Sequence, residues 1–274
     1  MTRPGLTEIA DIARRLYTAE QERKPIRQLS LDYPDMTVDD AYAVQRALVE
    51  LKVADGRVVK GRKIGLTSKV MQRAVSIDEP DYGALFDDMF VEDGGHVPAG
   101  RFIRPRVEVE LAFVLGEALC GPDVTLPDVL RATEFVRPAL EILDARVQMS
   151  DPETGHLRTI VDTIADNAAD AGLVLGGREF RPHDVDLRWV AALLIRNGTI
   201  EESGVAAAVL DHPGNGVAWL ANRLAPHGVA LKCGDVILSG SFTKPVFAEP
   251  GDTFVADYGP QGTVSVVFDP EPGS

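Results

Sequence analysis

Three glutamates in apolar surroundings are the residues whose type and spacing best suit chemistry. Glu108 and Glu110 alternate with apolar residues in RPRVEVELAFVLG, which places both on one face of an expected strand. Glu141 stands in a second apolar run, VRPALEILDAR. Because an isolated buried carboxylate is costly, such groups must be paired, protonated or bound to metal. Three carboxylates without a histidine favour Mg²⁺ or Mn²⁺ over zinc.

Ion pairing is a second interpretation of the same pattern. Arg106 lies on the glutamate face of the expected strand, and Arg137 precedes the second apolar run. If that strand lay at a sheet edge, Glu108 and Glu110 would point to solvent and pair with these arginines. Structural ion networks also perturb carboxylates, so spacing alone leaves metal ligation and ion pairing open.

A lysine in VVKGRKIGLTSK is a further candidate. Lys63 lies between Gly61 and Gly65, which permit close approach of a ligand or another strand. Such a lysine could bind a substrate carboxylate or, if desolvated, transfer protons near neutral pH. The competing interpretation is a solvated basic turn, because lysine is mostly exposed.

Two loop segments carry the remaining candidates. Asp81 lies in SIDEPDYGALFDDMF, which is rich in carboxylates but lacks the spacing of a calcium-binding EF-hand loop. The ordinary interpretation is a turn in which aspartates cap backbone amides. Ser241 follows Gly240 in LSGSFTKP, where a backbone amide and a hydroxyl could bind an anion or form part of a bulge.

Charge and composition exclude several classes of protein. The net charge is −14 over 274 residues, which argues against nucleic-acid binding and requires a local positive centre for any anionic ligand. The apolar runs are far shorter than the roughly twenty residues of a membrane span, and no secretory signal is recognisable. Cys120 and Cys233 show no metal or redox spacing, so we expect small buried thiols and a cytoplasmic protein. Neither a nucleotide-binding glycine motif nor a Gly-x-Ser-x-Gly elbow occurs.

The elements that must position these residues predict an α+β fold. Residues 1–70 are expected to be a helical N-terminal region, with an amphipathic helix in LTEIADIARRLYTAEQER and a second helix capped by Thr37. Residues 71–274 are expected to be a β-rich catalytic core with mixed, mostly antiparallel strands. Within it, Asn197-Gly198 predicts a hairpin turn, and HPGNGVAWLANRLAPHG predicts one inserted helix.

Several segments together resemble a known family. GRKIGLTSKVMQ, EPDYGALFDDMF, RPRVEVELAFVLG, RPALEILDAR, DTIADNAADAGLVLGG and SGSFTKP occur in this order. The chain therefore resembles the hydratase and decarboxylase branch of the fumarylacetoacetate hydrolase superfamily. The resemblance implies a β-roll or sandwich with outer helices, assembled into a homo-oligomer such as a pentamer or decamer.

The resemblance also implies roles for the candidate residues. Glu108, Glu110 and Glu141 would hold one Mg²⁺ or Mn²⁺. Lys63 and Asp81 would line the active site and carry its proton transfers, with their individual roles open. Ser241 would lie near the substrate carboxylate. Arg106 could meet a distal substrate carboxylate, although a salt bridge behind the site is the competing interpretation.

The implied reaction is metal-dependent hydration in the meta-cleavage catabolism of aromatic compounds. A 2-hydroxy-2,4-dienoate or 2-oxo-hept-4-ene-1,7-dioate would gain water at C4 after protonation at C5, giving 4-hydroxy-2-oxoheptane-1,7-dioate from the seven-carbon diacid. Alternatives are hydration of 2-oxopent-4-enoate, decarboxylation of a 4-oxalocrotonate-type substrate, and a non-catalytic oligomeric metal-binding protein. A glycosidase also needs two acids, but aromatic residues make up only 6% of the chain, too few to favour sugar stacking.

Overall fold

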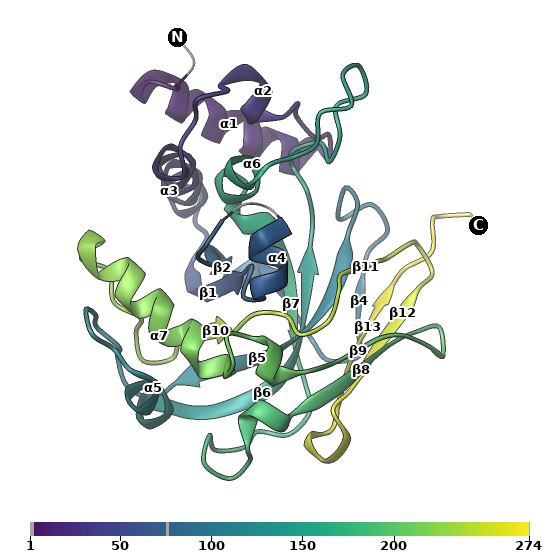
Figure 1. Cartoon of the computed structure of the whole chain (residues 1–274). Coiled ribbons are helices and arrows are strands. Elements are labelled where there is room, and N and C mark those ends of the chain that lie inside the picture. The colour runs from purple at the N-terminus through teal and green to yellow at the C-terminus, as the bar shows by residue number, and fades with distance from the viewer. Residues whose placement is uncertain (1–2, 75–76, 274) are drawn as a thin grey trace.

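The computed structural model describes residues 3–74 and 77–273 of the chain. Figure 1 shows the N-terminal helices at one end and a β-rich body below them. The helices are α1 (Leu6–Glu22), α2 (Leu29–Asp32), α3 (Val38–Ala54), α4 (Lys69–Ala74), α5 (Leu126–Ala132), α6 (Ile160–Ala165) and α7 (Pro213–Leu224). The strands are β1 (Val59–Gly65), β2 (Asp81–Phe86), β3 (Phe90–Val91), β4 (Gly95–Val97), β5 (Arg106–Leu115), β6 (Thr133–Leu143), β7 (Asp170–Leu175), β8 (Ala191–Arg196), β9 (Thr199–Val205), β10 (Val236–Leu238), β11 (Val246–Phe247), β12 (Thr253–Asp257) and β13 (Thr263–Phe268).

The two long N-terminal helices form as their sequences predict. In α1 the apolar stripe, including Ile12 and Leu16, is buried, and α1 packs on α3. Thr37 caps α3, since its Oγ1 accepts from the Asp40 amide at 3.2 Å while Asp40 Oδ2 accepts from the Thr37 amide at 2.9 Å. The helices end at Ala54, and β1 then joins the large sheet. The division of the chain at residue 70 stays a prediction.

The strands form two sheets. The larger has the order β2-β1-β10-β5-β6-β7-β3, with β11 also paired to β5, and the smaller has the order β4-β13-β12-β8-β9. The pairs β1–β10, β3–β7 and β4–β13 are parallel, and the other pairings are antiparallel. The predicted turn between β8 and β9 is present, with φ of 51° at Asn197 and 82° at Gly198. The α+β class with a mixed, mostly antiparallel core is confirmed.

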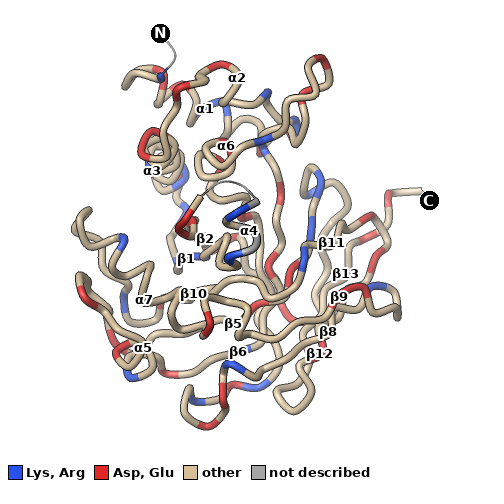
Figure 2. Tube along the Cα trace, viewed as in Figure 1, with Lys and Arg blue, Asp and Glu red and all other residues tan. Residues whose placement is uncertain are grey.

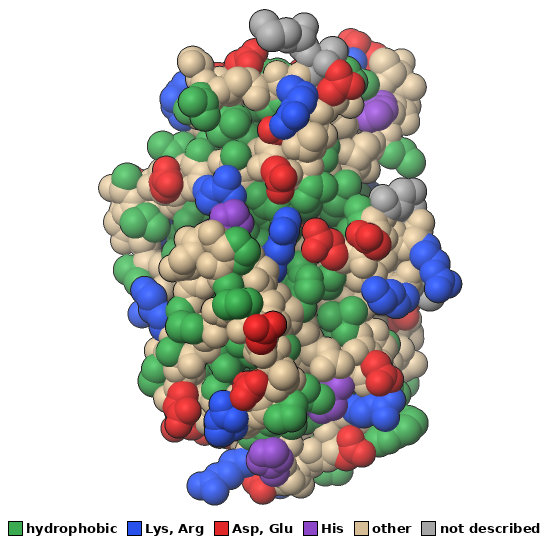
Figure 3. Space-filling model, turned by 60° about the vertical axis from the view of Figure 1, so that its left-hand side comes forward, with side chains coloured by type: hydrophobic (Ala, Val, Ile, Leu, Met, Phe, Trp, Pro, Cys, Tyr) green, Lys and Arg blue, Asp and Glu red, His purple; other side chains and the backbone are tan. Residues whose placement is uncertain are grey.

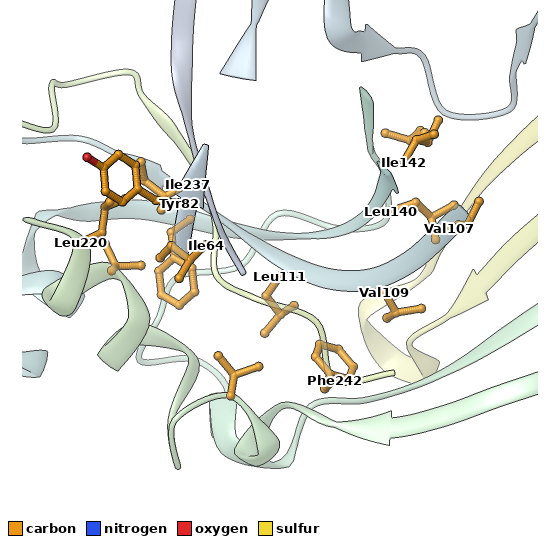
Figure 4. Packing of buried hydrophobic residues seen from close by; sticks show 14 of the residues in the cluster. Ile64, Tyr82, Val107, Val109, Leu111, Leu140, Ile142, Leu220, Ile237 and Phe242 are labelled. Atoms are coloured by element: carbon orange, nitrogen blue, oxygen red, sulfur yellow. The ribbon is translucent and has the colours of Figure 1, made fainter. Parts of the chain in front are cut away.

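Strand β5 lies inside the large sheet, between β10 and β6. On one of its faces Val107, Val109 and Leu111 are fully buried, and Figure 4 shows them among the core side chains. The glutamates occupy the other face, where Glu110 is buried and Glu108 is half-buried. The edge-strand interpretation, in which both glutamates point to solvent, is therefore wrong.

Tyr258 connects the smaller sheet to the backbone that carries the glutamates. It follows β12 and is buried. Its hydroxyl lies 2.6 Å from the carbonyl oxygen of Glu110 on β5 and 2.7 Å from that of Ala139 on β6, so its single proton is shared between two acceptors. The two sheets are thus joined by a buried polar contact next to the glutamates.

The surface shows how the acidic charge is distributed. Figure 2 shows acidic residues along the whole chain with basic residues among them. Figure 3 shows one face of the molecule, on which acidic and basic side chains are scattered among apolar ones. No helix in the described ranges is long and apolar enough to cross a membrane. Cys120 and Cys233 are free but exposed, so the expectation of buried thiols is wrong. Both stand in turn segments outside the sheets, where no core covers them.

Replacing Tyr258 with phenylalanine should destabilise the fold. The change leaves the ring in place but removes the hydroxyl that lies between the Glu110 and Ala139 carbonyl oxygens. We expect the free energy of unfolding to fall by about 1–3 kcal/mol, the range for a buried polar group left without its partner. Chemical denaturation measures it. Y33F is the matched control, because Tyr33 is only half-buried and its hydroxyl has no hydrogen bond among the described residues. Equal stability of Y258F and Y33F would contradict the role of this contact.

Candidate active site

The pairing of β5 with β6 brings the three predicted metal ligands together. Glu108 lies directly opposite Glu141 in this antiparallel register, and Glu110 lies two residues further along β5. One oxygen from each of the three carboxylates lies within 4.8 Å of the others. Like charges opposite one another destabilise a sheet, so this glutamate triad requires protons or positive charge.

The environment of the triad opposes its negative charge. Burial, followed by the charge of Glu141, raises the pKa of Glu108 to about 8 and raises the pKa of Glu110 well above its ordinary value. Glu141 is fully buried, and neither of its oxygens has a hydrogen-bond partner among the described residues. Buried carboxylate oxygens without donors are suited to a cation, and an all-oxygen set suits a hard divalent ion.

Lys63 supplies positive charge from within the chain. It projects from β1, its side chain is only 5% exposed, and its Nζ lies 3.1 Å from Glu141 Oε1. Burial opposes the ammonium charge, but the carboxylates of Glu141, Asp81 and Glu110 outweigh it, and the pKa of Lys63 is raised. The interpretation of Lys63 as a solvated turn residue is therefore wrong.

Asp81 lies beside Lys63 at the start of β2. It is buried rather than part of a solvated turn, and its Oδ1 has no hydrogen-bond partner among the described residues. Burial raises its pKa, and the charge of Lys63 partly reverses this effect. Gly65 makes room for both, because a Cβ there would come within 2.2 Å of Asp81 Oδ1 and 3.2 Å of Lys63 Nζ. A proton donor or acceptor pair is thus held next to the triad.

The loop after β10 closes another side of the triad. The Gly240 amide donates to Glu110 Oε2 at 2.9 Å. Gly240 has φ of +115°, and a Cβ would come within 2.4 Å of Thr67 Oγ1, so glycine is required on both grounds. The next residue, Ser241, is half-buried, and its hydroxyl donates to the Thr243 carbonyl at 2.9 Å. Ser241 therefore lies near the triad, and its contact with substrate stays a prediction.

Neither Arg106 nor Arg137 forms the ion pair with the glutamates that the ion-pair interpretation requires. Arg137 lies 3.7 Å from Glu179, not beside a glutamate of the triad. Arg106 is half-buried with its guanidinium 5.9 Å from the Phe247 ring, and it has no ion pair with any described residue. Burial and the charge of Glu141 raise the pKa of Glu108, and the charges of Lys63 and Arg106 partly offset this rise. Its role as a ligand for substrate stays a prediction.

Two charged residues near the site were not found from the sequence. Asp170 begins β7, is fully buried, and has no hydrogen-bond partner for either carboxylate oxygen among the described residues. Burial, followed by the charge of Glu141, raises its pKa. Its position at the start of the apolar run AGLVLG was a usable signal. Arg158 lies in the loop between β6 and α6, and its sequence neighbours Leu157 and Thr159 give no indication that its side chain is buried.

Comparison with known proteins identifies the family. Residues 59–268 match the family described as fumarylacetoacetate (FAA) hydrolase C-terminal. The chain belongs to this family. The fumarylacetoacetate hydrolase fold expected from the sequence motifs is thereby confirmed, and the glutamate triad lies within the matched range.

Relatives of high identity are hydratases. The chain is 61% identical over 257 residues to 2-oxo-hept-4-ene-1,7-dioate hydratase from Escherichia coli, covering 94% of this chain and 96% of that protein. It is 41% identical over 259 residues to 2-keto-4-pentenoate hydratase from Paraburkholderia xenovorans (strain LB400), covering 94% of each.

A solved relative has almost the same fold. The structure of 4-oxalocrotonate decarboxylase from Pseudomonas putida G7, complexed with magnesium and adipate, gives a TM-score of 0.91 at 34% identity over 97% of this chain and 98% of that one. A second structure of that decarboxylase, complexed with calcium and acetate, gives 0.90 at 34% identity over the same shares. The branch expected from the sequence thus includes both hydratases and decarboxylases.

Metal binding to the triad should depend on pH. Burial and the charge of Glu141 raise the pKa of Glu108 from its ordinary 4.5 to about 8. Between these values the folded chain retains a proton that the unfolded chain has released, so rising pH destabilises the metal-free protein. A cation binds the deprotonated form. We therefore expect Mg²⁺ affinity to increase with pH up to about 8, with proton release on binding, measured by calorimetry in buffers of different ionisation enthalpy.

The substitution E141Q keeps the shape of the side chain and removes one ligand charge. It should weaken Mg²⁺ binding by about tenfold or more, since even residues behind metal ligands commonly contribute that much. E117Q is the control, because Glu117 is exposed just after β5. Binding that releases no protons near pH 7, or that is equally strong in E141Q and E117Q, would exclude the triad as the metal site.

Proposed function

We propose that the chain catalyses divalent-metal-dependent hydration of a 2-hydroxy-2,4-dienoate, with 2-oxo-hept-4-ene-1,7-dioate as the physiological form of the substrate. The product is then 4-hydroxy-2-oxoheptane-1,7-dioate, and the enzyme is a lyase of aromatic catabolism. The observation that carries the proposal is the buried triad of carboxylates beside the Lys63–Asp81 pair. The hydratases among its relatives support the same reaction.

The triad would hold the cation through Glu108, Glu110 and Glu141. All three offer oxygen atoms. Neither oxygen of Glu141 accepts a hydrogen bond from a described residue, although Lys63 Nζ lies 3.1 Å from Oε1, and this supports a cation that completes the site. When bound, a divalent ion stabilises negative charge that develops on the 2-oxygen of the substrate. Mg²⁺ is the proposed ion, because one structure of a relative was solved with magnesium, although another was solved with calcium. Mn²⁺ has the same preference for oxygen ligands.

Lys63 and Asp81 carry the proposed proton transfers. Ketonisation of the dienol removes the proton of the 2-hydroxyl group and adds one at C5. Water then adds at C4, and C3 takes up a proton. Lys63 Nζ is held as an ammonium by Glu141 and can donate, whereas the unpartnered Oδ1 of Asp81 can accept a proton from water. Ser241 is the proposed contact for the substrate carboxylate, and its hydroxyl would exchange its hydrogen bond with the Thr243 carbonyl for one with the substrate.

Decarboxylation is the second candidate function. The specific observation in its favour is the TM-score of 0.91 with 4-oxalocrotonate decarboxylase. Such a reaction would place the same 2-oxo acid group at the triad and lose carbon dioxide from the other end. The identity of 61% with a hydratase makes hydration the stronger proposal.

Assembly and location complete the proposal. Trp189, just before β8, and Ile200, on β9 at the end of the strand order of the smaller sheet, are both more than half exposed. An unpaired strand edge with apolar side chains is suited to contact with another copy, so we propose a homo-oligomer of pentameric or decameric type. The free thiols fit a cytoplasmic setting.

Turnover of the dienoate tests the function directly. Loss of the ultraviolet absorbance of 2-hydroxyhepta-2,4-dienedioate should require Mg²⁺ and stop with EDTA, and mass spectrometry should find the hydrated product. E108Q should lose activity, while E117Q, at an exposed position, should retain it. Release of carbon dioxide would favour the decarboxylase. Full turnover after complete metal removal, or unchanged turnover in E108Q, would contradict the mechanism.

Lys63→Met separates proton transfer from metal binding. Loss of a proton-transferring group should lower kcat by about 10²–10⁴-fold. Mg²⁺ affinity should not weaken, because Lys63 Nζ lies 3.1 Å from Glu141 Oε1 and competes for it. D81N should also lower kcat. Deuterium incorporation at C5 and C3 in D₂O would show which step each variant loses. A K63M variant that binds Mg²⁺ poorly and keeps kcat would contradict this assignment.

A further inference from the structure

Arg158 is a buried arginine whose charge is only partly paired. It lies between β6 and α6, and its side chain is 5% exposed. The Nε group donates to Thr163 Oγ1 at 2.9 Å. Neither Nη1 nor Nη2 makes a hydrogen bond with any described residue. Arginine stays charged in proteins, so these donors represent an unmet need for an anion.

The nearby carboxylate of Asp166 does not meet this need. Its Oδ2 lies 3.5 Å from Arg158 Nη1, which makes a long ion pair but no hydrogen bond. Asp166 is already bound by Arg146, whose Nε donates to Oδ1 and whose amide donates to Oδ2 at 2.9 Å. A buried charged donor without a hydrogen bond is strongly unfavourable. If Arg158 and Asp166 formed a purely structural ion pair, we would expect a shorter distance with a hydrogen bond between them. Arg158 is therefore held by its hydrogen bond to Thr163, while its two terminal nitrogens lack hydrogen bonds to described residues.

The position of Arg158 connects it to the active site. Its loop leaves β6 shortly after Glu141, and the following helix α6 contacts β2, the strand that begins at Asp81. Burial raises the pKa of Asp81, and the charge of Arg158 is among those that lower it. Among the described residues, Arg158 thus keeps two terminal nitrogens without a hydrogen bond and has only a long ion pair with Asp166, and Arg106 has no ion pair.

We infer that Arg158 binds the distal carboxylate of a dicarboxylate substrate whose 2-oxo acid end lies at the glutamate triad. This inference rests on the proposed function and identifies the residue that selects the seven-carbon diacid. The planar guanidinium can donate two parallel hydrogen bonds to a carboxylate, which gives direction as well as charge. A five-carbon monoacid would leave the guanidinium unpaired, so the site would discriminate against it. Arg106 adds positive charge without direct contact.

Binding of two matched ligands tests the inference on the Mg²⁺-loaded enzyme. 2-Oxoheptanedioate and 2-oxoheptanoate have the same chain length and differ only in the distal carboxylate. The wild-type protein should bind the diacid about 10- to 100-fold more tightly, the range for hydrogen bonds between charged groups. In R158Q this preference should fall to about twofold, while affinity for the monoacid stays unchanged. Calorimetry measures both.

Two further variants keep the test decisive. R158K retains the positive charge but loses the two parallel donors of the guanidinium group. It should therefore fold and keep an intermediate preference for the diacid even if R158Q does not fold. R104Q removes a neighbouring exposed guanidinium and should leave the preference unchanged. An equal loss of affinity for both ligands in the Arg158 variants would indicate a structural role and overturn the inference. An equal effect of R104Q would indicate general electrostatic attraction and would also overturn it.

Kinetics separate this inference from the proposed function. If the wild-type enzyme hydrates no dienoate, the proposed function fails irrespective of Arg158. If it hydrates the seven-carbon substrate but R158Q and R158K retain the wild-type KM, only the inference about the distal carboxylate fails. The expected result is a KM for the diacid raised at least tenfold in R158Q, with a much smaller change in kcat.

Discussion

The antiparallel register in which β5 pairs with β6 is the constraint on which the rest of the site depends. It places Glu108 opposite Glu141, an arrangement that repels unless a proton or cation intervenes. The register is held from the other face, where Val107 and Val109 are fully buried in the core. A shift of one residue would turn the valines towards the site and the glutamates into the core. Burial of apolar side chains thus holds together carboxylates that would otherwise separate.

The positive charges around the triad follow from this constraint. A protein with a net charge of −14 can bind an anion only if local cations outweigh the overall field. Lys63 provides one such charge within the sheet, where Glu141 keeps it protonated. Because the same carboxylate would also bind the metal ion, loading of the site and the proton affinity of Lys63 are coupled. Charge in one part of the site cannot change without affecting the other.

The sequence predicted those parts of the site that depend on local pattern. Strict alternation identified the face shared by Glu108 and Glu110, and an apolar run identified Glu141. The register that joins them depends on packing between distant segments, which a local pattern cannot specify. Arg158 was missed for the same reason, since its burial and its contacts with Thr163 and Asp166 depend on how its loop packs in the folded chain. The exposure of Cys120 and Cys233 also depends on which segments the core leaves uncovered.

The residues proposed for the chemistry and the residue proposed to select the substrate stand on different kinds of structure in this fold. The triad, Lys63 and Asp81 all stand on paired strands of one sheet, where neighbouring strands fix their positions. Arg158 stands on a connecting loop, and loops accept substitution more readily than paired strands. If Arg158 binds the substrate tail, a family built in this way would be able to exchange that residue without disturbing the register that holds the three glutamates. Relatives that share the fold and act on acids of different length, such as the pentenoate and heptenedioate hydratases, are what such a separation would produce.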